Sequence, residues 1–170
     1  MKNVVIIGFM GTGKTTVGKM LAQRLGFNFL DLDKEIERSQ GILIREIFEI
    51  YGEERFREIE TETIRSFKDK SNMVISAGGG VVTREENIKM LRENGIIVSL
   101  TAEPEVIFER VKHNKDRPLL LTSNPFETIK TLLKSRRELY KNADIEINTS
   151  NLSPLQVVQE IVDGLDKRRK

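Results

Sequence analysis

A glycine-rich segment directly after an apolar run near the amino terminus limits this chain to a small group of folds. Residues 8–15 read Gly-Phe-Met-Gly-Thr-Gly-Lys-Thr, and the run before them is Val4-Val5-Ile6-Ile7. This is the G-x-x-x-x-G-K-[ST] pattern between a strand and a helix, the setting in which it cradles phosphates. The glycines allow positive φ angles, so several backbone N–H groups point toward one centre, and the following helix adds its positive dipole end. The segment predicts a nucleoside triphosphate site.

Side chains inside this loop predict how the triphosphate is bound. Lys14 reaches the β- and γ-phosphates, and the hydroxyl of Thr15 is a ligand for Mg²⁺. The residues expected to bind ATP here are Gly11, Thr12, Gly13, Lys14, Thr15 and Thr16. Motors, switches, helicases and small-molecule kinases share such a loop, so the rest of the chain must identify the phosphoryl acceptor.

Five short apolar runs predict the strands of one sheet. They cover residues 4–7, 27–32, 73–76, 96–100 and 145–147. Most are continuous rather than alternating, which is typical of strands buried on both faces of a parallel sheet. Helical patterns lie between them, with starts predicted at Thr83, Asn124 and Ser153. The fold class is therefore α/β, with helices on both faces of a parallel sheet. The chain shows no linker, so we expect one domain over residues 1–170.

Composition excludes several other classes of protein. Lysine and arginine total 28 against 26 acidic residues, and a net charge of +2 argues against a nucleic-acid or anionic-membrane partner. There is no cysteine, which excludes thiolate catalysis and cysteine-held metals, and His113 alone excludes a multi-histidine metal site. No apolar run is long enough for a membrane span or a signal peptide, so we expect a cytoplasmic protein with no membrane partner.

Two further features follow predicted strands. The second strand ends Leu30-Asp31-Leu32-Asp33, and the third is followed by Gly78-Gly79-Gly80. Open α/β sheets bind ligands at the carboxyl ends of their strands, so one aspartate would serve the metal shell and the other an acceptor hydroxyl. Glycines there allow a ligand to approach the backbone closely. The alternatives are a pair of aspartates that begin a helix, and a flexible loop.

Three arginines are candidates for binding an anionic ligand. Arg57 lies on a predicted helix, beside its buried stripe, with Glu53 four residues before it and Glu60 three after it. A guanidinium held in this way suits a bidentate carboxylate contact, although a surface helix with ion pairs would look the same. Arg117 lies in a charged, proline-containing stretch that suits a lid, and Arg136 lies on a later helix. Each of these two alone would be read as a solvated charge.

Taken together, these features resemble the shikimate kinases, in the order expected for that family and over nearly the whole chain. The combination that carries the resemblance is Leu-Asp-x-Asp, Phe-Arg-x-x-Glu, Gly-Gly-Gly, Arg-Pro-Leu-Leu and Arg-x-x-Leu-Tyr after the phosphate-binding loop. The resemblance implies a three-layer fold like that of nucleoside monophosphate kinases, with a central five-stranded parallel sheet. It also implies phosphorylation of the 3-hydroxyl of shikimate by ATP and Mg²⁺, a step in making chorismate and the aromatic amino acids.

The same resemblance implies roles for individual residues. Asp33 would hold the acceptor hydroxyls, as a base or as a positioning group, and Arg57 and Arg136 would clamp the carboxylate. Gly78, Gly79 and Gly80 would line the substrate site. Arg117 would contact ATP from a lid at residues 112–122, and Asp31 would support Mg²⁺ through water. Residues 34–60 would form a substrate-binding segment, and the family implies a monomer.

The sequence departs from the family pattern at one place, and three other classes of protein are alternatives to this interpretation. Residues 148–152 read Asn-Thr-Ser-Asn-Leu, without the arginine that some members place there beside the adenine. A gluconate-type or nucleoside monophosphate kinase shares the fold, but two arginines and three glycines favour a carboxylate acceptor. A GTPase would need Asn-Lys-x-Asp, whereas Asn114-Lys115-Asp116 places the aspartate one position early. A nucleic-acid-driven ATPase would be expected to show a basic face.

Overall fold

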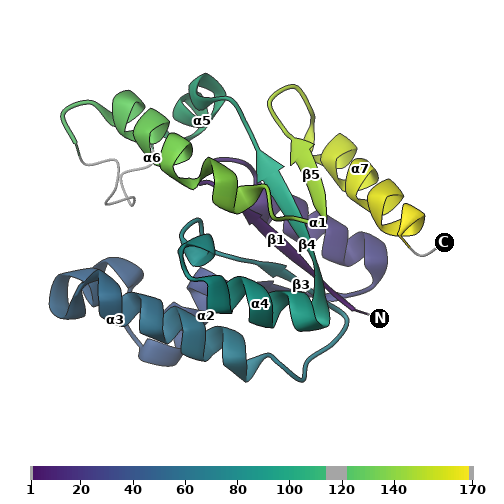
Figure 1. The fold of residues 1–170 in the computed structure, drawn as a ribbon, viewed down its shortest axis with the longest axis horizontal. Helices are drawn as coiled ribbons and strands as arrows, with labels where there is room; N and C mark the ends of the chain where they lie inside the picture. Colours follow the sequence, from purple (N-terminus) through teal and green to yellow (C-terminus); the bar gives the residue numbers. More distant parts are fainter. Residues whose placement is uncertain (1, 114–121, 169–170) are drawn as a thin grey trace.

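A parallel five-stranded sheet forms the centre of the molecule (Figure 1). The computed structural model describes residues 2–113 and 122–168. The strands are β1 (Asn3–Gly8), β2 (Asn28–Asp31), β3 (Met73–Ser76), β4 (Gly95–Thr101) and β5 (Ile145–Asn148). Their order across the sheet is β2-β3-β1-β4-β5. All five predicted strands are confirmed, with small changes at their ends.

Strand β1 is buried on both faces, as its unbroken apolar run predicts. Its alternate residues enter two separate hydrophobic cores, because successive side chains of a strand point to opposite faces. Val5 and Ile7 pack into one core, and Val4 and Ile6 pack into the other. The sheet is therefore the middle of three layers, as expected.

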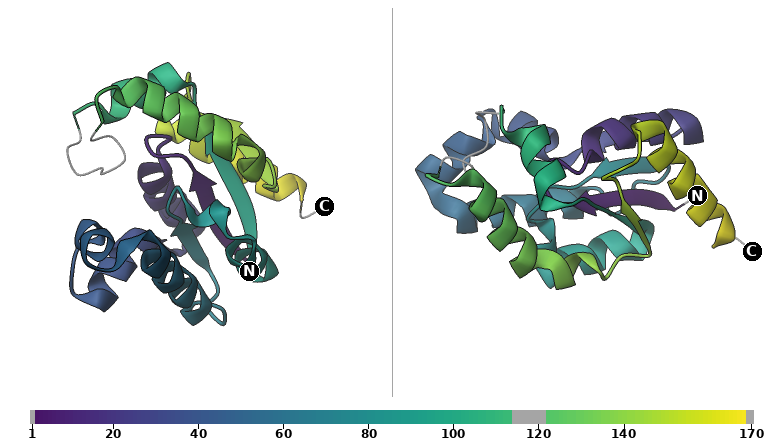
Figure 2. Two further views of the ribbon diagram at one scale, coloured as in Figure 1. Left: turned by 60° about the vertical axis from the view of Figure 1, so that its left-hand side comes forward. Right: turned by 90° about the horizontal axis from the view of Figure 1, so that it is seen from above.

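Helices cover both faces of this sheet (Figure 2). On one face lie α1 (Lys14–Leu25) and α7 (Pro154–Lys167), which supply apolar side chains such as Leu21 and Ile161 to one core. The other core takes side chains from the remaining helices: α2 (Leu32–Gln40), α3 (Ile44–Ser66), α4 (Glu85–Asn94), α5 (Pro104–Val111) and α6 (Pro125–Tyr140). None of the helices in this described part combines the length and apolar character that a membrane span requires.

Two of the three predicted helix starts are confirmed. The Asn124 side chain accepts a hydrogen bond from the N–H of Glu127 at the start of α6, and Ser153 forms a capping box with Gln156 at the start of α7. The start predicted at Thr83 is wrong. Its hydroxyl donates to the carbonyl of Gly80, 2.7 Å away, within a short 3₁₀ turn at Val81–Thr83. Helix α4 begins two residues later, without a side-chain cap.

Helix α3 is broken at Gly52, and this break shapes the site. Gly52 has φ 79° and ψ 172°, a conformation that side chains disfavour, and no atom lies near where its Cβ would be. Backbone conformation, rather than lack of space, therefore explains the glycine. The second part of α3 begins immediately after it with Glu53 and Glu54.

Candidate functional site

The loop between β1 and α1 has the backbone geometry that its sequence predicts. Gly11 has φ 74°, and Gly13, which caps α1, has φ 96°. A Cβ on Gly11 would also lie 2.8 Å from a methyl carbon of Val111. Both positions therefore require glycine, and the loop brings its N–H groups to the amino end of α1, where the helix dipole favours an anion.

Some side chains of the loop form hydrogen bonds within it, and others are exposed to solvent. Thr12 is buried, and its hydroxyl donates to the carbonyl of Phe9 at 2.8 Å, so this side chain shapes the loop itself. The amine of Lys14 donates to the same carbonyl at 2.9 Å, which folds the lysine back over the loop. Thr15 and Thr16 are exposed at the start of α1.

Arg110, which the sequence analysis did not single out, joins this loop to the end of β5. Its guanidinium donates to the carbonyl of Gly11 at 3.0 Å and to the carbonyl of Thr149 at 3.0 Å. The Thr149 hydroxyl in turn donates to the carbonyl of Thr12 at 3.1 Å. The stretch 148–152 lacks an arginine of its own, yet the fold brings one to it from α5. No pattern in the sequence marks Arg110, because its partners lie far away along the chain.

The two aspartates at the end of β2 begin a helix, as one interpretation of their sequence predicts. Asp31 ends the strand and caps α2: one carboxylate oxygen accepts from the N–H of Lys34, and the other accepts from the Thr15 hydroxyl at 3.0 Å. Asp33 lies in the first turn of α2, and its Oδ1 is 2.8 Å from the point where a Cβ on Gly78 would lie. These residues therefore begin a helix and also face the neighbouring loops.

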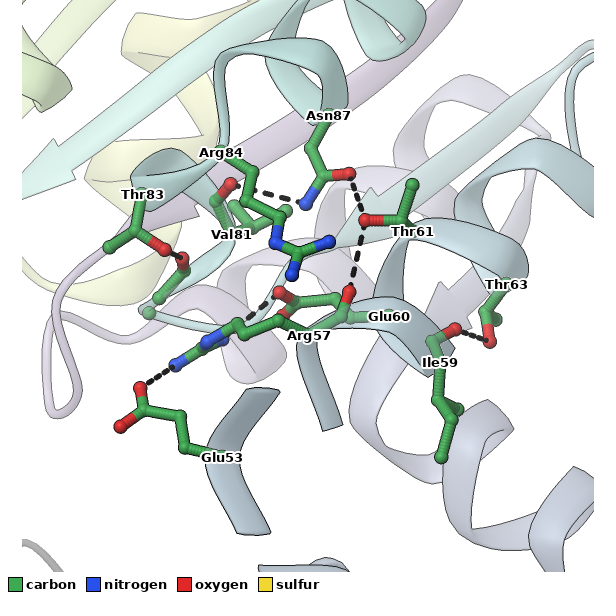
Figure 3. A network of polar contacts seen from close by, with 12 residues as sticks. Glu53, Arg57, Ile59, Glu60, Thr61, Thr63, Val81, Thr83, Arg84 and Asn87 are labelled. Atoms are coloured by element: carbon green, nitrogen blue, oxygen red, sulfur yellow. Dashed lines mark hydrogen bonds and ion pairs between the residues drawn. The ribbon is translucent and has the colours of Figure 1, made fainter. Parts of the chain in front are cut away.

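Arg57 lies at the centre of a charged group on the second part of α3 (Figure 3). Its guanidinium contacts Glu60 at 3.0 Å and Glu53 at 3.3 Å, the two partners that the sequence spacing predicts. The arginine side chain is only 11% exposed. A Cβ on Gly80 would collide with the guanidinium, so the absence of a side chain at Gly80 makes room for it.

Glu60 is the most buried member of this group. Its side chain is 0% exposed, and one oxygen accepts from Arg57 while Oε1 has no hydrogen-bond partner in the described part of the chain. The pKa of Glu60 is raised to about 7, mainly by burial and in part by the nearby Asp33 carboxylate, while Arg57 and Arg84 oppose the shift. Figure 3 shows Arg84 reaching toward this group from the start of α4.

Helix α6 brings two residues to the glycine loop after β3. Arg136 donates to the carbonyl of Gly79 at 3.4 Å, and the Tyr140 hydroxyl donates to the same carbonyl. Burial raises the pKa of Tyr140 to about 12, so this hydroxyl keeps its proton and remains a donor. The Arg-x-x-Leu-Tyr pattern contains Tyr140, but only the fold shows that its hydroxyl reaches Gly79.

These elements enclose a cleft of about 720 Å³ at the carboxyl ends of the strands. Ile44, Phe48 and Phe56 supply apolar lining. The predicted site residues that line the cleft are Thr15, Asp31, Asp33, Arg57, Gly78, Gly79, Gly80 and Arg136. The adjoining phosphate loop contains the other predicted site residues, Gly11, Thr12, Gly13, Lys14 and Thr16.

Arg117 and most of the predicted lid, residues 114–121, lie outside the described residues. A second hollow of about 410 Å³ opens beside Gly95 and contains none of the predicted site residues.

The burial of Glu60 predicts a pH-dependent stability. A carboxyl group with a raised pKa in the folded state makes folding less favourable as pH rises from its ordinary pKa through the raised value. Between about pH 5 and about pH 8, wild type should lose up to about 3 kcal/mol of unfolding free energy relative to Glu60→Gln, which carries no charge there. Calorimetric melting of both proteins across this range tests the prediction. Parallel curves for the two proteins would contradict it.

Comparisons with known proteins agree on one family. A model of the shikimate kinase family matches residues 10–166. The shikimate kinase of Thermodesulfovibrio yellowstonii is 52% identical over 98% of this chain and 96% of its own length, and that of Geobacter sulfurreducens is 51% identical over 94% and 88%. The structure of the Acinetobacter baumannii shikimate kinase in complex with shikimate has a TM-score of 0.95 at 38% identity, covering 99% of this chain and 94% of that one. A gluconokinase from Sinorhizobium meliloti, 18% identical with a TM-score of 0.64, covers 98% and 92% and shares the fold alone.

Proposed function

The chain belongs to the shikimate kinase family, and we propose that its cleft binds shikimate against the phosphate loop for transfer of a phosphoryl group from ATP to the 3-hydroxyl. Shikimate kinase activity, a step of the shikimate pathway that leads to the aromatic amino acids, is thus the activity of this chain. The proposal concerns which residues of this chain bind the two substrates and the metal ion.

The convergence of Arg57 and Arg136 on consecutive glycines carries the proposal. The guanidinium of Arg57 lies against Gly80, and that of Arg136 reaches the carbonyl of Gly79, although the two arginines come from different helices. Two planar cations on one side of a cleft suit a carboxylate, which accepts bidentate hydrogen bonds from guanidinium groups. Asp33 faces the same glycine loop beside Gly78, where a carboxylate accepts hydrogen bonds from hydroxyl groups. A polyhydroxylated carboxylic acid such as shikimate matches this set of groups.

Around the nucleotide, the chain supplies positive charge and holds the phosphates in position. Phosphoryl transfer has a loose transition state, so a kinase mainly holds the reacting groups in line and stabilises the spread negative charge. Lys14, the loop N–H groups and the amino end of α1 provide that stabilisation. Arg110 holds the loop to Thr149 and so keeps the N–H groups in place. In this proposal Asp33 accepts a hydrogen bond from the acceptor hydroxyl and acts as its base or as a positioning group.

The oxygens at the start of α1 and the end of β2 fit Mg²⁺. The Thr15 hydroxyl and the Asp31 carboxylate lie 3.0 Å apart, and Mg²⁺ prefers one or two such protein oxygens together with water and substrate phosphates. The described residues contain no cluster of three or more acidic or histidine side chains, so they offer no all-protein cage. Thr15 would bind the ion directly and Asp31 through water. The ion would supply charge that neutralises the phosphates.

We also propose that the chain acts as one domain and as a monomer. In this proposal residues 34–60, which include α2 and the first part of α3, form the substrate-binding segment, because their side chains line the cleft next to Asp33. Residues 112–122 form the lid and bring Arg117 to ATP; of these, 114–121 lie outside the described residues.

Release of ADP in the presence of different acceptors tests the function. We expect MgATP turnover to rise by orders of magnitude with shikimate, and to stay at the background rate with gluconate or a nucleoside monophosphate. Leaving out Mg²⁺, with EDTA present, should reduce the shikimate-dependent rate to background. Phosphorus NMR of the product identifies the phosphorylated hydroxyl. Turnover with gluconate instead of shikimate would overturn the acceptor assignment.

A further inference from the structure

Glu60 presents an oxygen that the contacts of the protein leave unsatisfied. Its Oε2 accepts from Arg57 at 3.0 Å, while Oε1 has no hydrogen-bond partner among the described residues, although the side chain is 0% exposed. Buried carboxylate oxygens without partners are rare because each loses its hydration without replacement. This oxygen is near the substrate cleft: it lies 3.3 Å from the point where a Cβ on Gly78 would be.

The charged side chains around Glu60 come from four helices. Arg57, on its own helix, is its ion-pair partner and also contacts Glu53. Asp33, from α2, approaches the same Gly78 position with its Oδ1 at 2.8 Å. Arg84, at the start of α4, is paired with Glu54 and Glu86, and its positive charge also acts to lower the pKa of Glu60. Arg136 of α6 also lines the cleft.

We propose that Glu60 takes up a proton from solvent when the carboxylate of shikimate pairs with Arg57. The inference rests on the proposed function of the cleft, since it needs a substrate carboxylate at that arginine. In the free enzyme, ionised Glu60 holds the guanidinium in position. In the complex, the proton sits on Oε1, while Oε2 continues to accept from Arg57. Glu60 is thus a positioning residue that exchanges a proton as the substrate arrives.

Charge balance explains why binding would move this proton. The guanidinium of Arg57 already contacts two carboxylates, and shikimate would add a third negative group beside the buried side chain of Glu60, where charges are poorly screened. Protonation of Glu60 removes one of these charges and turns its unsatisfied acceptor into a donor. The pKa of Glu60 is raised to about 7 mainly by burial, so a further negative charge nearby is enough to shift its protonation near neutrality.

A definite pH dependence of substrate affinity follows. Below the pKa of the free enzyme, Glu60 is already protonated, so the affinity for shikimate should not change with pH. Above about pH 7, each unit of pH should weaken binding by up to about tenfold, until the pKa of the complex is passed. Affinity is thus highest on the acidic side.

Isothermal titration calorimetry of the full-length protein with shikimate tests this directly. Near pH 7.5, the binding heat is measured in phosphate, HEPES and Tris, whose ionisation enthalpies differ. The slope of heat against ionisation enthalpy gives the number of protons exchanged. We expect wild type to take up a large fraction of one proton, and Glu60→Gln to take up none. Glu58→Gln, an exposed glutamate on the same helix, is the matched control and should behave as wild type.

The calorimetric results distinguish failure of the role of Glu60 from failure of shikimate binding itself. Binding without proton uptake in wild type, or uptake that persists in Glu60→Gln, would overturn the role of Glu60. Absence of shikimate binding by wild type would instead overturn the proposed function. Should Glu60→Gln fail to bind, the infrared difference spectrum of wild type labelled with 13C-glutamate decides when shikimate is added. A new protonated-carboxyl band that shifts with the label supports uptake by a glutamate, because aspartates do not carry the label, and absence of such a band overturns uptake by Glu60.

Discussion

Replacement of Arg57 by alanine is expected to raise the KM for shikimate by roughly 30- to 1,000-fold, with little change in the KM for ATP. The guanidinium lies against Gly80 inside the cleft. Lys14 and Thr15, which bind nucleotide in our proposal, lie instead at the start of α1. In our proposal, the substitution removes one half of the carboxylate clamp and leaves Arg136 as the other half. Steady-state kinetics with each substrate varied in turn measures the two KM values separately.

Because Glu60 is buried against Arg57, the loss of the arginine could also destabilise the fold, and a second variant separates the two effects. Arg57→Ala removes the ion-pair partner of a fully buried carboxylate, which by itself destabilises proteins by about 3–5 kcal/mol. Arg57→Ala combined with Glu60→Gln leaves no uncompensated charge and should restore the melting temperature without restoring shikimate affinity. Arg55→Ala is the control, because Arg55 is half-exposed on the same helix and its ion-pair partners among the described residues are Glu58 and Glu62. Equal losses toward ATP and shikimate in the double variant would refute the assigned role.

Replacement of Lys14 by methionine is expected to lower kcat by about 10²- to 10³-fold. Methionine keeps most of the length and apolar character of the side chain and removes only its charge and hydrogen-bond donors. The lysine amine lies over the phosphate loop, 2.9 Å from the carbonyl of Phe9, where a cation can stabilise charge on the transferred phosphoryl group. Since the clamp arginines and Asp33 remain, the KM for shikimate should change little.

Lys19→Met provides the matched control for this prediction. Lys19 is exposed on the same helix, α1, and the substitution makes the same chemical change away from the loop. Its kcat should equal that of wild type. Single-turnover measurements at saturating substrates separate the chemical step from product release. A chemical rate of Lys14→Met within tenfold of wild type would show that the lysine does not stabilise the transition state.

Local patterns in the sequence were enough to predict the sheet and the phosphate loop. Continuous apolar runs form buried strands because both faces of a central strand are covered, and β1 shows this with alternate residues in two cores. The loop glycines were predictable because positive φ angles depend on the residue itself and its immediate neighbours. The wrong helix start at Thr83 shows the limit of such patterns, since its hydroxyl bonds to Gly80 in a preceding turn.

The sequence by itself determined the fold class, the nucleotide loop and the residue types of the site, including the spacing that pairs Arg57 with Glu53 and Glu60. Only the tertiary structure decided which of these charges is buried and what each one faces. Glu60 is fully buried because α3 packs against α2 and α4, and Arg110 reaches Gly11, 99 residues away along the chain. Tyr140 meets Gly79 across 61 residues. Burial and long-range contacts arise when distant segments pack together, and no local pattern of residues contains that information.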